Sequence, residues 1–385
     1  MVSHLNALNK YLLIMPVRII ILMICFGLSV FSGLNSVKAQ VLQDTNSSNL
    51  IKADIDCIYN LHFQEASEFY VKIKKKYPGY PGLYLLRGLS TYWQNYPMLY
   101  SNPAHIAFEE DMRKCIRLSE KNNDDAVHAE FLLINLCARG MLLRFYDDNN
   151  RMLEVVPLVT STYKLLRHSF NFTRYCADLY YYTGVYNFYR EAYPEVYPIY
   201  APLALLLPPG NIETGLKELH LAATNAVVLR GESYYMLALI YLNFKNKFEK
   251  SIDYCKSLYG LYPENVLYLS IYLKNLLLLK QYDNAEKLIL TSLRESENKF
   301  FQAQLMVFYG VVQEKKYHDF NLAQQYYQSG ISKISPYGKY GNEYMAFAYY
   351  GMSRISEIKS EKDTCKKFRQ LAVKMGDFKK LNFDN

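Results

Sequence analysis

The side chains of this sequence that could do chemistry are its histidines, its acidic pairs and its cysteines. None lies in a catalytic or metal-binding pattern, since there is no phosphate-cradling glycine loop, HExxH pair, nucleophile elbow or clustered CxxC motif. Glu109 with Glu110 and Asp124 with Asp125 fall near expected helix ends, where solvation or the helix dipole accounts for them. The scattered histidines are expected at turns or on the surface: His62, His105, His128, His168, His220 and His318. The sequence therefore predicts no enzyme, with no catalytic residues, no metal and no cofactor. An enzyme whose residues converge from distant segments stays as an alternative.

The cysteines form no disulfide framework by their spacing. Beyond Cys25 they are Cys57, Cys115, Cys137, Cys176, Cys255 and Cys365, and none forms a close pair. Cys255 and Cys365 occupy corresponding interior places in two repeats, where a small apolar residue belongs. We therefore expect buried free thiols, while a bridge in an oxidising compartment stays open.

The segment that precedes the helical elements is expected to be an N-terminal export signal. Arg18 precedes a mostly apolar run at residues 19–34, and Val37, Lys38 and Ala39 follow, so we expect cleavage after Ala39. Initiation at Met15, an uncleaved anchor and lipidation at Cys25 are alternatives. Residues 1–39 are thus interpreted as a signal peptide, and the polar residues 40–49 as a flexible lead-in. This signal favours the bacterial periplasm, or the periplasmic face of an envelope membrane, with peripheral membrane association at most.

The charge and length set limits on the partner. The chain of 385 residues is 51% hydrophobic and carries a formal charge of +8, part of which lies in the predicted signal. Because the remaining excess is mild and no long basic run occurs, nucleic acid is not expected as a partner. The oligomeric state does not follow from the sequence.

One stretch, residues 231–263, is the unit that the rest of the chain repeats. It reads as two helices and a turn, because its apolar residues recur at helical spacing and a proline closes it. The residues of its first helix are Tyr234, Leu237, Ala238 and Tyr241, and those of its second are Ser251, Cys255 and Leu258, with Pro263 at the end. The same spacing appears at Ala66, Tyr70, Ile73 and Pro78. Residues 126–168 keep the helical spacing without this signature.

This unit resembles the tetratricopeptide repeat (TPR), with its pattern of aromatic, small and proline positions over about 34 residues. Residues 182–240 are also similar to a group of exported bacterial repeat proteins of unassigned role and, more loosely, to eukaryotic outer-membrane TPR proteins. The resemblance implies an all-α, right-handed α-solenoid of antiparallel helix pairs, with about seven to eight hairpins over residues 50–381. It supplies no chemical activity.

The resemblance also implies a concave groove, lined by the first helix of each pair. Residues flanking the interior positions would face it: Leu85, Leu89, Tyr92, Tyr181, Val185, Phe188, Tyr235, Leu239 and Leu242, followed by Met345 and Met352. Few of these are charged, which argues against a groove that grips acidic peptide ends and favours a helix or an extended apolar segment. A phase error of one residue, or an insert that fills the groove, would remove this site.

The repeats are interrupted by a segment rich in proline and tyrosine at residues 189–211, whose prolines cannot all sit inside one regular helix. Its candidate binding residues are Tyr189, Arg190, Tyr193, Tyr197 and Tyr200, which could form an aromatic patch for a peptide or for sugar rings. Packing against neighbouring helices is the alternative. The sequence therefore predicts a non-enzymatic protein-interaction scaffold of the cell envelope that binds a partner peptide or helix. A glycan or cell-wall-binding module is the alternative function.

Overall fold

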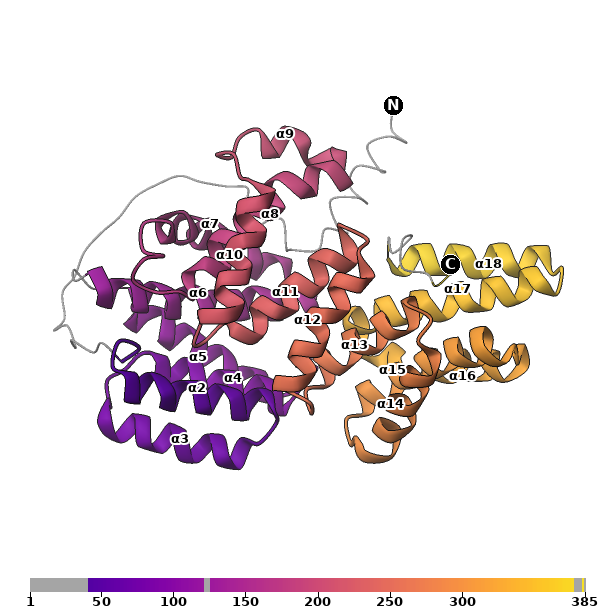
Figure 1. The fold of residues 1–385 in the computed structure, drawn as a ribbon, viewed down its shortest axis with the longest axis horizontal. Coiled ribbons are helices and arrows are strands. Elements are labelled where there is room, and N and C mark those ends of the chain that lie inside the picture. The colour runs from indigo at the N-terminus through magenta and orange to yellow at the C-terminus, as the bar shows by residue number, and fades with distance from the viewer. Residues whose placement is uncertain (1–40, 121–124, 377–382, 384–385) are drawn as a thin grey trace. The chain divides into compact units, whose positions relative to one another are not determined.

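The computed structural model describes residues 41–120, 125–376 and 383. Over these residues the backbone forms helices and no strand, so the predicted all-α class is confirmed (Figure 1). Helices that follow one another along the chain pack as neighbours, as in an α-solenoid. The predicted signal peptide at 1–39 lies outside the described residues. Among the helices of 41–120 and 125–376, none combines the length and apolar character needed to cross a bilayer.

The chain divides into two compact units, one formed by Met1–Ile58 and His62–Ser233 and the other by Tyr59–Leu61 and Tyr234–Asn385. We call them unit 1 and unit 2. The helices of unit 1 are α2 (Thr45–Tyr59), α3 (Phe63–Lys76), α4 (Gly82–Gln94), α5 (Ala104–Leu118), α6 (Asp125–Asp148), α7 (Met152–Ser169), α8 (Leu179–Val196), α9 (Ala201–Ala204) and α10 (Ile212–Asn225), with a 3-10 turn, η2 (Pro198–Tyr200). Helix α11 (Arg230–Asn243) begins in unit 1, and its residues from Tyr234 onward belong to unit 2.

Helices α8 and α10 of unit 1 pack closely together, with Gly184 and Gly215 at their contact. A Cβ atom on Gly184 would lie 2.9 Å from the carbonyl oxygen of Gly215. A Cβ atom on Gly215 would lie 2.6 Å from the backbone nitrogen of Phe188. Because any side chain would push the two backbones apart, glycine at both positions permits their close approach.

Unit 2 continues with helices of similar length. They are α12 (Phe248–Leu261), α13 (Val266–Leu278), α14 (Tyr282–Glu295), α15 (Lys299–Val312), α16 (Phe320–Ile334), α17 (Asn342–Ile358) and α18 (Lys362–Met375), with a π turn, η3 (Gln313–Tyr317), and a 3-10 segment, η4 (Ser335–Gly341). Several begin at a side-chain cap: Asn298 accepts the amide of Phe301 at 2.9 Å, and Asp319 accepts the amide of Leu322 at 2.9 Å. These caps satisfy amides that have no partner inside the helix.

The interior of each unit follows the helical spacing of the sequence. Ser251, Cys255 and Leu258 are fully buried on α12, and the Ser251 hydroxyl donates to the carbonyl of Ala238 on α11 at 2.8 Å. The described cysteines form no disulfide, and Cys255 is among the buried ones, as expected for a small interior residue. The spacing that identified the repeat therefore also identifies its packed face.

Two boundaries differ from the sequence prediction. The lead-in at 40–49 was expected to be flexible, but Val41 is fully buried, the amide of Leu42 donates to Glu130 Oε2 at 3.0 Å, and α2 already begins at Thr45. The expected insert at 189–211 starts as a continuation of α8, which runs to Val196 and contains Pro194. A proline so close to the end of a helix removes only one of its last backbone hydrogen bonds, so the helix tolerates it.

Candidate binding site

A pocket of about 530 Å³ lies in unit 1, between α5, α6 and α7. Side chains at helical spacing on each helix line it, so each helix contributes one stripe. The lining residues are Arg113, Ile116 and Arg117 of α5; Arg139, Leu142 and Tyr146 of α6; and Leu153, Glu154, Pro157, Leu158 and Ser161 of α7. The pocket therefore combines an apolar floor with a cluster of guanidinium groups.

The opposite face of α5 explains why its arginines are available to the pocket. Phe108, Met112 and Cys115 are fully buried and hold α5 in the core of unit 1. The ring of Phe108 lies 5.4 Å from that of Phe145 on α6. Because these residues fix one side of the helix, Arg113 and Arg117 are left on the exposed side.

The most buried of the three arginines is Arg139, which is only 8% exposed. Its Nε donates to Asn135 Oδ1 at 2.6 Å, and its Nη1 donates to Ser161 Oγ at 2.7 Å. Its Nη2 is 3.6 Å from Glu120 Oε1, in an ion pair whose carboxylate side chain is 52% exposed. Burial lowers the pKa of Arg139, yet an arginine keeps its charge at any physiological pH. The structure thus holds a charged fork in a fixed position.

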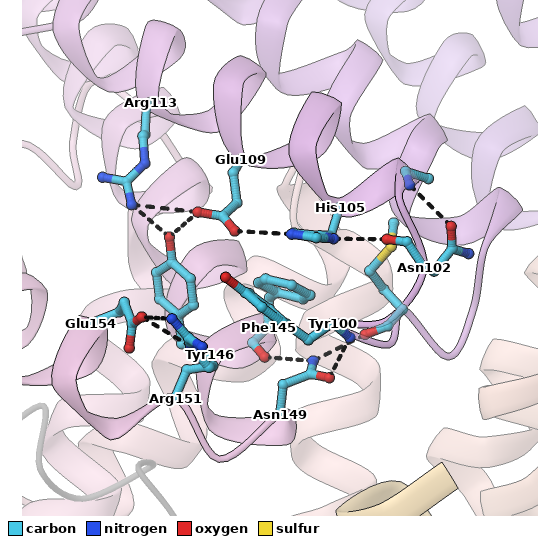
Figure 2. Close-up of polar contacts among 12 residues, drawn as sticks. Tyr100, Asn102, His105, Glu109, Arg113, Phe145, Tyr146, Asn149, Arg151 and Glu154 are labelled. Carbon is cyan, nitrogen blue, oxygen red and sulfur yellow. Dashed lines mark hydrogen bonds and ion pairs between the residues drawn. The ribbon is translucent and has the colours of Figure 1, made fainter. Parts of the chain in front are cut away.

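Arg113 is held at the edge of the pocket by Tyr146 and Glu109 (Figure 2). Its Nη2 donates to the Tyr146 hydroxyl at 2.7 Å and to Glu109 Oε2 at 3.4 Å, and the same hydroxyl donates to Glu109 at 2.5 Å. Burial, and then the bond to Glu109, raise the pKa of Tyr146, so this hydroxyl stays protonated. The Glu109 carboxylate also lies 4.0 Å from His105, which bonds the carbonyl of Asn102 at 2.7 Å.

The one acidic side chain of the lining is already balanced. Glu154 forms a hydrogen-bonded ion pair with Arg151, which lies outside the lining (Figure 2). The bond to Arg151 lowers the pKa of Glu154, so it is ionised and paired. Arg117, by contrast, is exposed and forms no ion pair or hydrogen bond with any residue that the structure describes. The lining therefore carries an excess of positive charge.

Apolar groups lie directly beside these charges. Leu153, in the first turn of α7, is 90% exposed, which is unusual for a leucine that lines a pocket. Ile116 and Leu142 are buried and form part of the floor. Since Leu153 and Arg117 are both exposed, the pocket is open to solvent and a ligand could extend beyond it.

The structure places most of the predicted groove residues in the interior rather than on an open surface. In unit 1, Leu85 and Leu89 are 5% exposed, Tyr92 and Phe188 are fully buried, and Tyr181 and Val185 are half-buried. The ring of Tyr92, for example, packs 5.7 Å from that of Phe108. The unit 2 residues of the set are also buried: Tyr235, Leu239, Leu242, Met345 and Met352. None of these residues lines the α5–α7 pocket.

The predicted aromatic residues of the insert mostly make internal contacts. Tyr193 is 7% exposed, and its ring stacks on that of Tyr197 at 4.6 Å. Arg190 donates to the carbonyl of Leu207 at 3.2 Å and pairs with Glu191 at 3.1 Å. The half-buried Tyr189 lies 5.3 Å from Phe188, and the side chain of Tyr200 is outside the described part.

The surface of the insert is apolar rather than aromatic. After α8 the chain passes through η2 and α9, which lies beside the end of α8 (Figure 1). Ile199 is 64% exposed, Leu205 80% and Leu206 79%. An exposed stack of tyrosine faces, which sugar binding would need, is absent from the side chains that the structure describes here.

The metal-ligating side chains of the described residues form no metal-binding cluster. No group of three or more His, Cys, Asp or Glu side chains is placed to hold a metal ion there. The closest approach to one is His128 and His168, whose Nε2 atoms are 3.2 Å apart. Burial and the neighbouring His128 lower the pKa of His168, which favours the neutral form of the His168 imidazole.

The pocket was not predicted from the sequence. Its arginines lie on two separate helices, α5 and α6, and two of its three helices come from residues 126–168, where the repeat signature is absent. A signal that could have found it is the helical spacing of Arg113 with Arg117, together with Leu153 at a helix start, where a polar residue is usual.

Comparison with known proteins does not identify a family for this chain. No protein-family model matches the chain, and no curated protein matches it either.

Proposed function

We propose that this chain is a non-enzymatic helical-repeat scaffold of the TPR type that binds a segment of a partner protein. In unit 1 the binding site is the pocket between α5, α6 and α7. The observation that carries the proposal is an open pocket in which buried apolar groups adjoin charged side chains held in fixed positions. A preformed surface of this kind loses little conformational freedom when a partner docks.

The openness of the pocket favours a protein segment over a small molecule. Sites for small ligands enclose most of the ligand surface, about 70–90% or more. Here Leu153 and Arg117 stand exposed at the rim, so a compact ligand would keep much of its surface in water. A peptide or helix can fill the pocket with a few side chains and continue across the neighbouring surface.

The export signal in the sequence supports a site of action in the cell envelope, and we include this location in the proposal. The glycan-binding alternative has weaker support, because Tyr193 is buried and stacked on Tyr197.

Site-specific photo-cross-linking in cells that produce the chain tests the proposal. A photoreactive phenylalanine analogue replaces Leu153 in one variant and Val373 of α18, which is also exposed, in the matched control. We expect a discrete cross-linked protein adduct from position 153 only. The absence of an adduct at 153, or the same set of adducts from both positions, would contradict the proposal.

A further inference from the structure

The charged residues of the α5–α7 pocket indicate the chemistry of the partner that it binds. Three arginines line it, and its single acidic residue, Glu154, is paired with Arg151. Glu109 offsets the charge of Arg113 through a direct ion pair. Arg117 has no acidic partner among the described residues, and Arg139 has only the exposed Glu120 at 3.6 Å. The uncompensated positive charge therefore centres on Arg117, and Arg139 beside it is paired only with an exposed carboxylate.

The donors of Arg139 are arranged in a way that suits an incoming carboxylate. Asn135 and Ser161 occupy its Nε and Nη1, and its Nη2 makes no hydrogen bond within the described residues. Because Arg139 is already immobilised and nearly buried, its desolvation has been completed in the folded state. A carboxylate that binds there gains a charge-assisted hydrogen bond without the entropy cost of ordering the arginine.

The apolar lining sets a second requirement. Leu153, Pro157 and Leu158 of α7 face the same pocket as these arginines. A simple inorganic anion would satisfy the charge and leave Leu153 in water. A fatty-acid anion would satisfy both, but its chain would lie largely outside an open pocket. A peptide that carries acidic and apolar side chains close together satisfies both requirements.

We infer that the partner segment is an acidic peptide, which places a carboxylate against Arg117 and Arg139 and an apolar side chain against Leu153 and Pro157. This inference rests on the proposed function and names the chemistry of its partner. The sequence-based expectation of an uncharged groove concerned other residues, none of which lines this pocket. The pocket recognises acidic segments by charge and apolar contact rather than by aromatic stacking.

The test uses fluorescence anisotropy with the purified chain and defined probes. The first probe is a short fluorescein-labelled peptide of repeating Leu-Glu-Glu, the second has Gln in place of every Glu, and the third has Lys there. We expect the acidic peptide to bind at least about tenfold more tightly than the Gln peptide, and its affinity to fall as salt is raised. Unlabelled decanoate serves as a competitor that represents a lipid-like anion.

The matched variants are Arg117→Gln and Lys114→Gln, which remove one positive charge each from α5. Lys114 lies outside the lining, where its ammonium contacts the ring of Tyr84 at 4.6 Å. We expect Arg117→Gln to weaken binding of the acidic peptide about five- to tenfold, and Lys114→Gln to change it less than about twofold. Far-UV circular dichroism shows whether each variant is folded. Arg139→Lys, which keeps the charge but loses the fork, should also weaken binding.

The outcomes separate the two proposals. Equal binding of the Glu and Gln peptides, or equal effects of the two α5 variants, would overturn the acidic preference while leaving a cross-link at position 153 as support for the pocket. A rise in the thermal stability of the chain on addition of decanoate, with no binding of any peptide, would assign the pocket to a lipid-like anion and overturn the inference. The absence of both peptide binding and a cross-link would overturn the pocket itself.

Discussion

The buried Glu314 of unit 2 and the exposed Arg117 of unit 1 differ in how completely they are paired within the fold. In unit 2, Glu314 is 3% exposed and both carboxylate oxygens are occupied: Oε1 accepts Arg354 Nε at 2.7 Å, and Oε2 accepts Arg354 Nη2 at 2.9 Å and the Tyr327 hydroxyl at 2.7 Å. Burial alone would raise the pKa of Glu314, but the bonds to Arg354 and Tyr327 outweigh it and the net shift is downward. In unit 1, the pocket leaves Arg117 without an acidic partner among the described residues.

This difference separates charges that hold the fold from charges that are available to a partner. A buried ion pair whose groups are all hydrogen-bonded belongs to the architecture, and removing one member leaves an uncompensated charge inside. An exposed arginine beside a pocket contributes little to stability, so its position there is better explained by what it can bind. Three substitutions of charged residues test this division and one glycine substitution tests the helix packing of unit 1; they follow from the largest expected effect to the smallest.

The largest loss of stability is expected from Glu314→Ala. It removes the Glu314 carboxylate that accepts hydrogen bonds from Arg354 and from the buried Tyr327 hydroxyl, which should lower the free energy of unfolding by about 3–5 kcal/mol. Urea denaturation measures the change, with Glu357→Ala as the control because Glu357 is exposed on α17. A loss below about 1 kcal/mol would show that the unit 2 network is not a structural pair.

The second substitution tests the close approach of α8 and α10 in unit 1. Gly215→Ala places a Cβ atom 2.6 Å from the backbone of Phe188, so α8 and α10 must separate at a cost of about 1–3 kcal/mol. Gly260→Ala in α12 is the control, because nothing lies within 4 Å of its added Cβ. We expect that control to gain about 0.5–1 kcal/mol from helix propensity, and thermal unfolding should move the two variants in opposite directions.

The third concerns a buried acid with no compensating charge, Asp54 of α2. Its Oδ2 has no hydrogen-bond partner among the described residues, and burial raises its pKa from 3.8 to about 8. As pH rises from about 4 to 8, the unfolded chain loses this proton while the folded chain keeps it, so stability falls across that window. Asp54→Asn removes the loss and should stabilise the protein at pH 8 by about 1–2 kcal/mol.

Denaturant unfolding at several pH values checks this result. Glu130, whose pKa burial raises to about 7, has the same sign and should leave a residual slope in the variant. A variant that is as sensitive to pH as the parent would mean that Asp54 is ionised or solvated in the folded state. Asp253→Asn, at a side chain that is 73% exposed, is the matched control.

The smallest change in stability is expected from Arg117→Gln. Because Arg117 is exposed and unpaired among the described residues, its loss should change the free energy of unfolding by less than about 0.5 kcal/mol. Urea denaturation of this variant beside Glu314→Ala gives the comparison directly. A loss above about 1 kcal/mol would place Arg117 with the structural charges of unit 2 instead.

The sequence predicted the helical fold but did not predict the binding pocket. The spacing of Ser251, Cys255 and Leu258 predicts the buried face of α12, because burial of a helix depends on local periodicity. The pocket depends on how three helices meet. Arg117 and Arg139 lie in one pocket because α5, α6 and α7 pack together. A local sequence pattern does not predict this packing.

The same limit explains the residues that were expected to line a groove. The spacing of the repeat predicts Tyr92 and Phe188 on an open groove. Neighbouring helices can also bury residues that flank the interior positions, and both side chains are buried. Val41 shows a similar effect, since a polar lead-in becomes ordered once one apolar residue is buried and Glu130 accepts an amide. Tertiary packing determined these positions.

A charge reversal is the most direct measurement for the central claim that the α5–α7 pocket binds an acidic segment. Arg117→Glu is titrated with the Leu-Glu-Glu peptide and with its Lys counterpart, beside the unchanged chain and beside Lys114→Glu. The account predicts that Arg117→Glu loses affinity for the acidic peptide by at least about tenfold and gains affinity for the basic one, while Lys114→Glu changes neither by more than about twofold. Equal affinities of both peptides for the unchanged chain and for Arg117→Glu would contradict it.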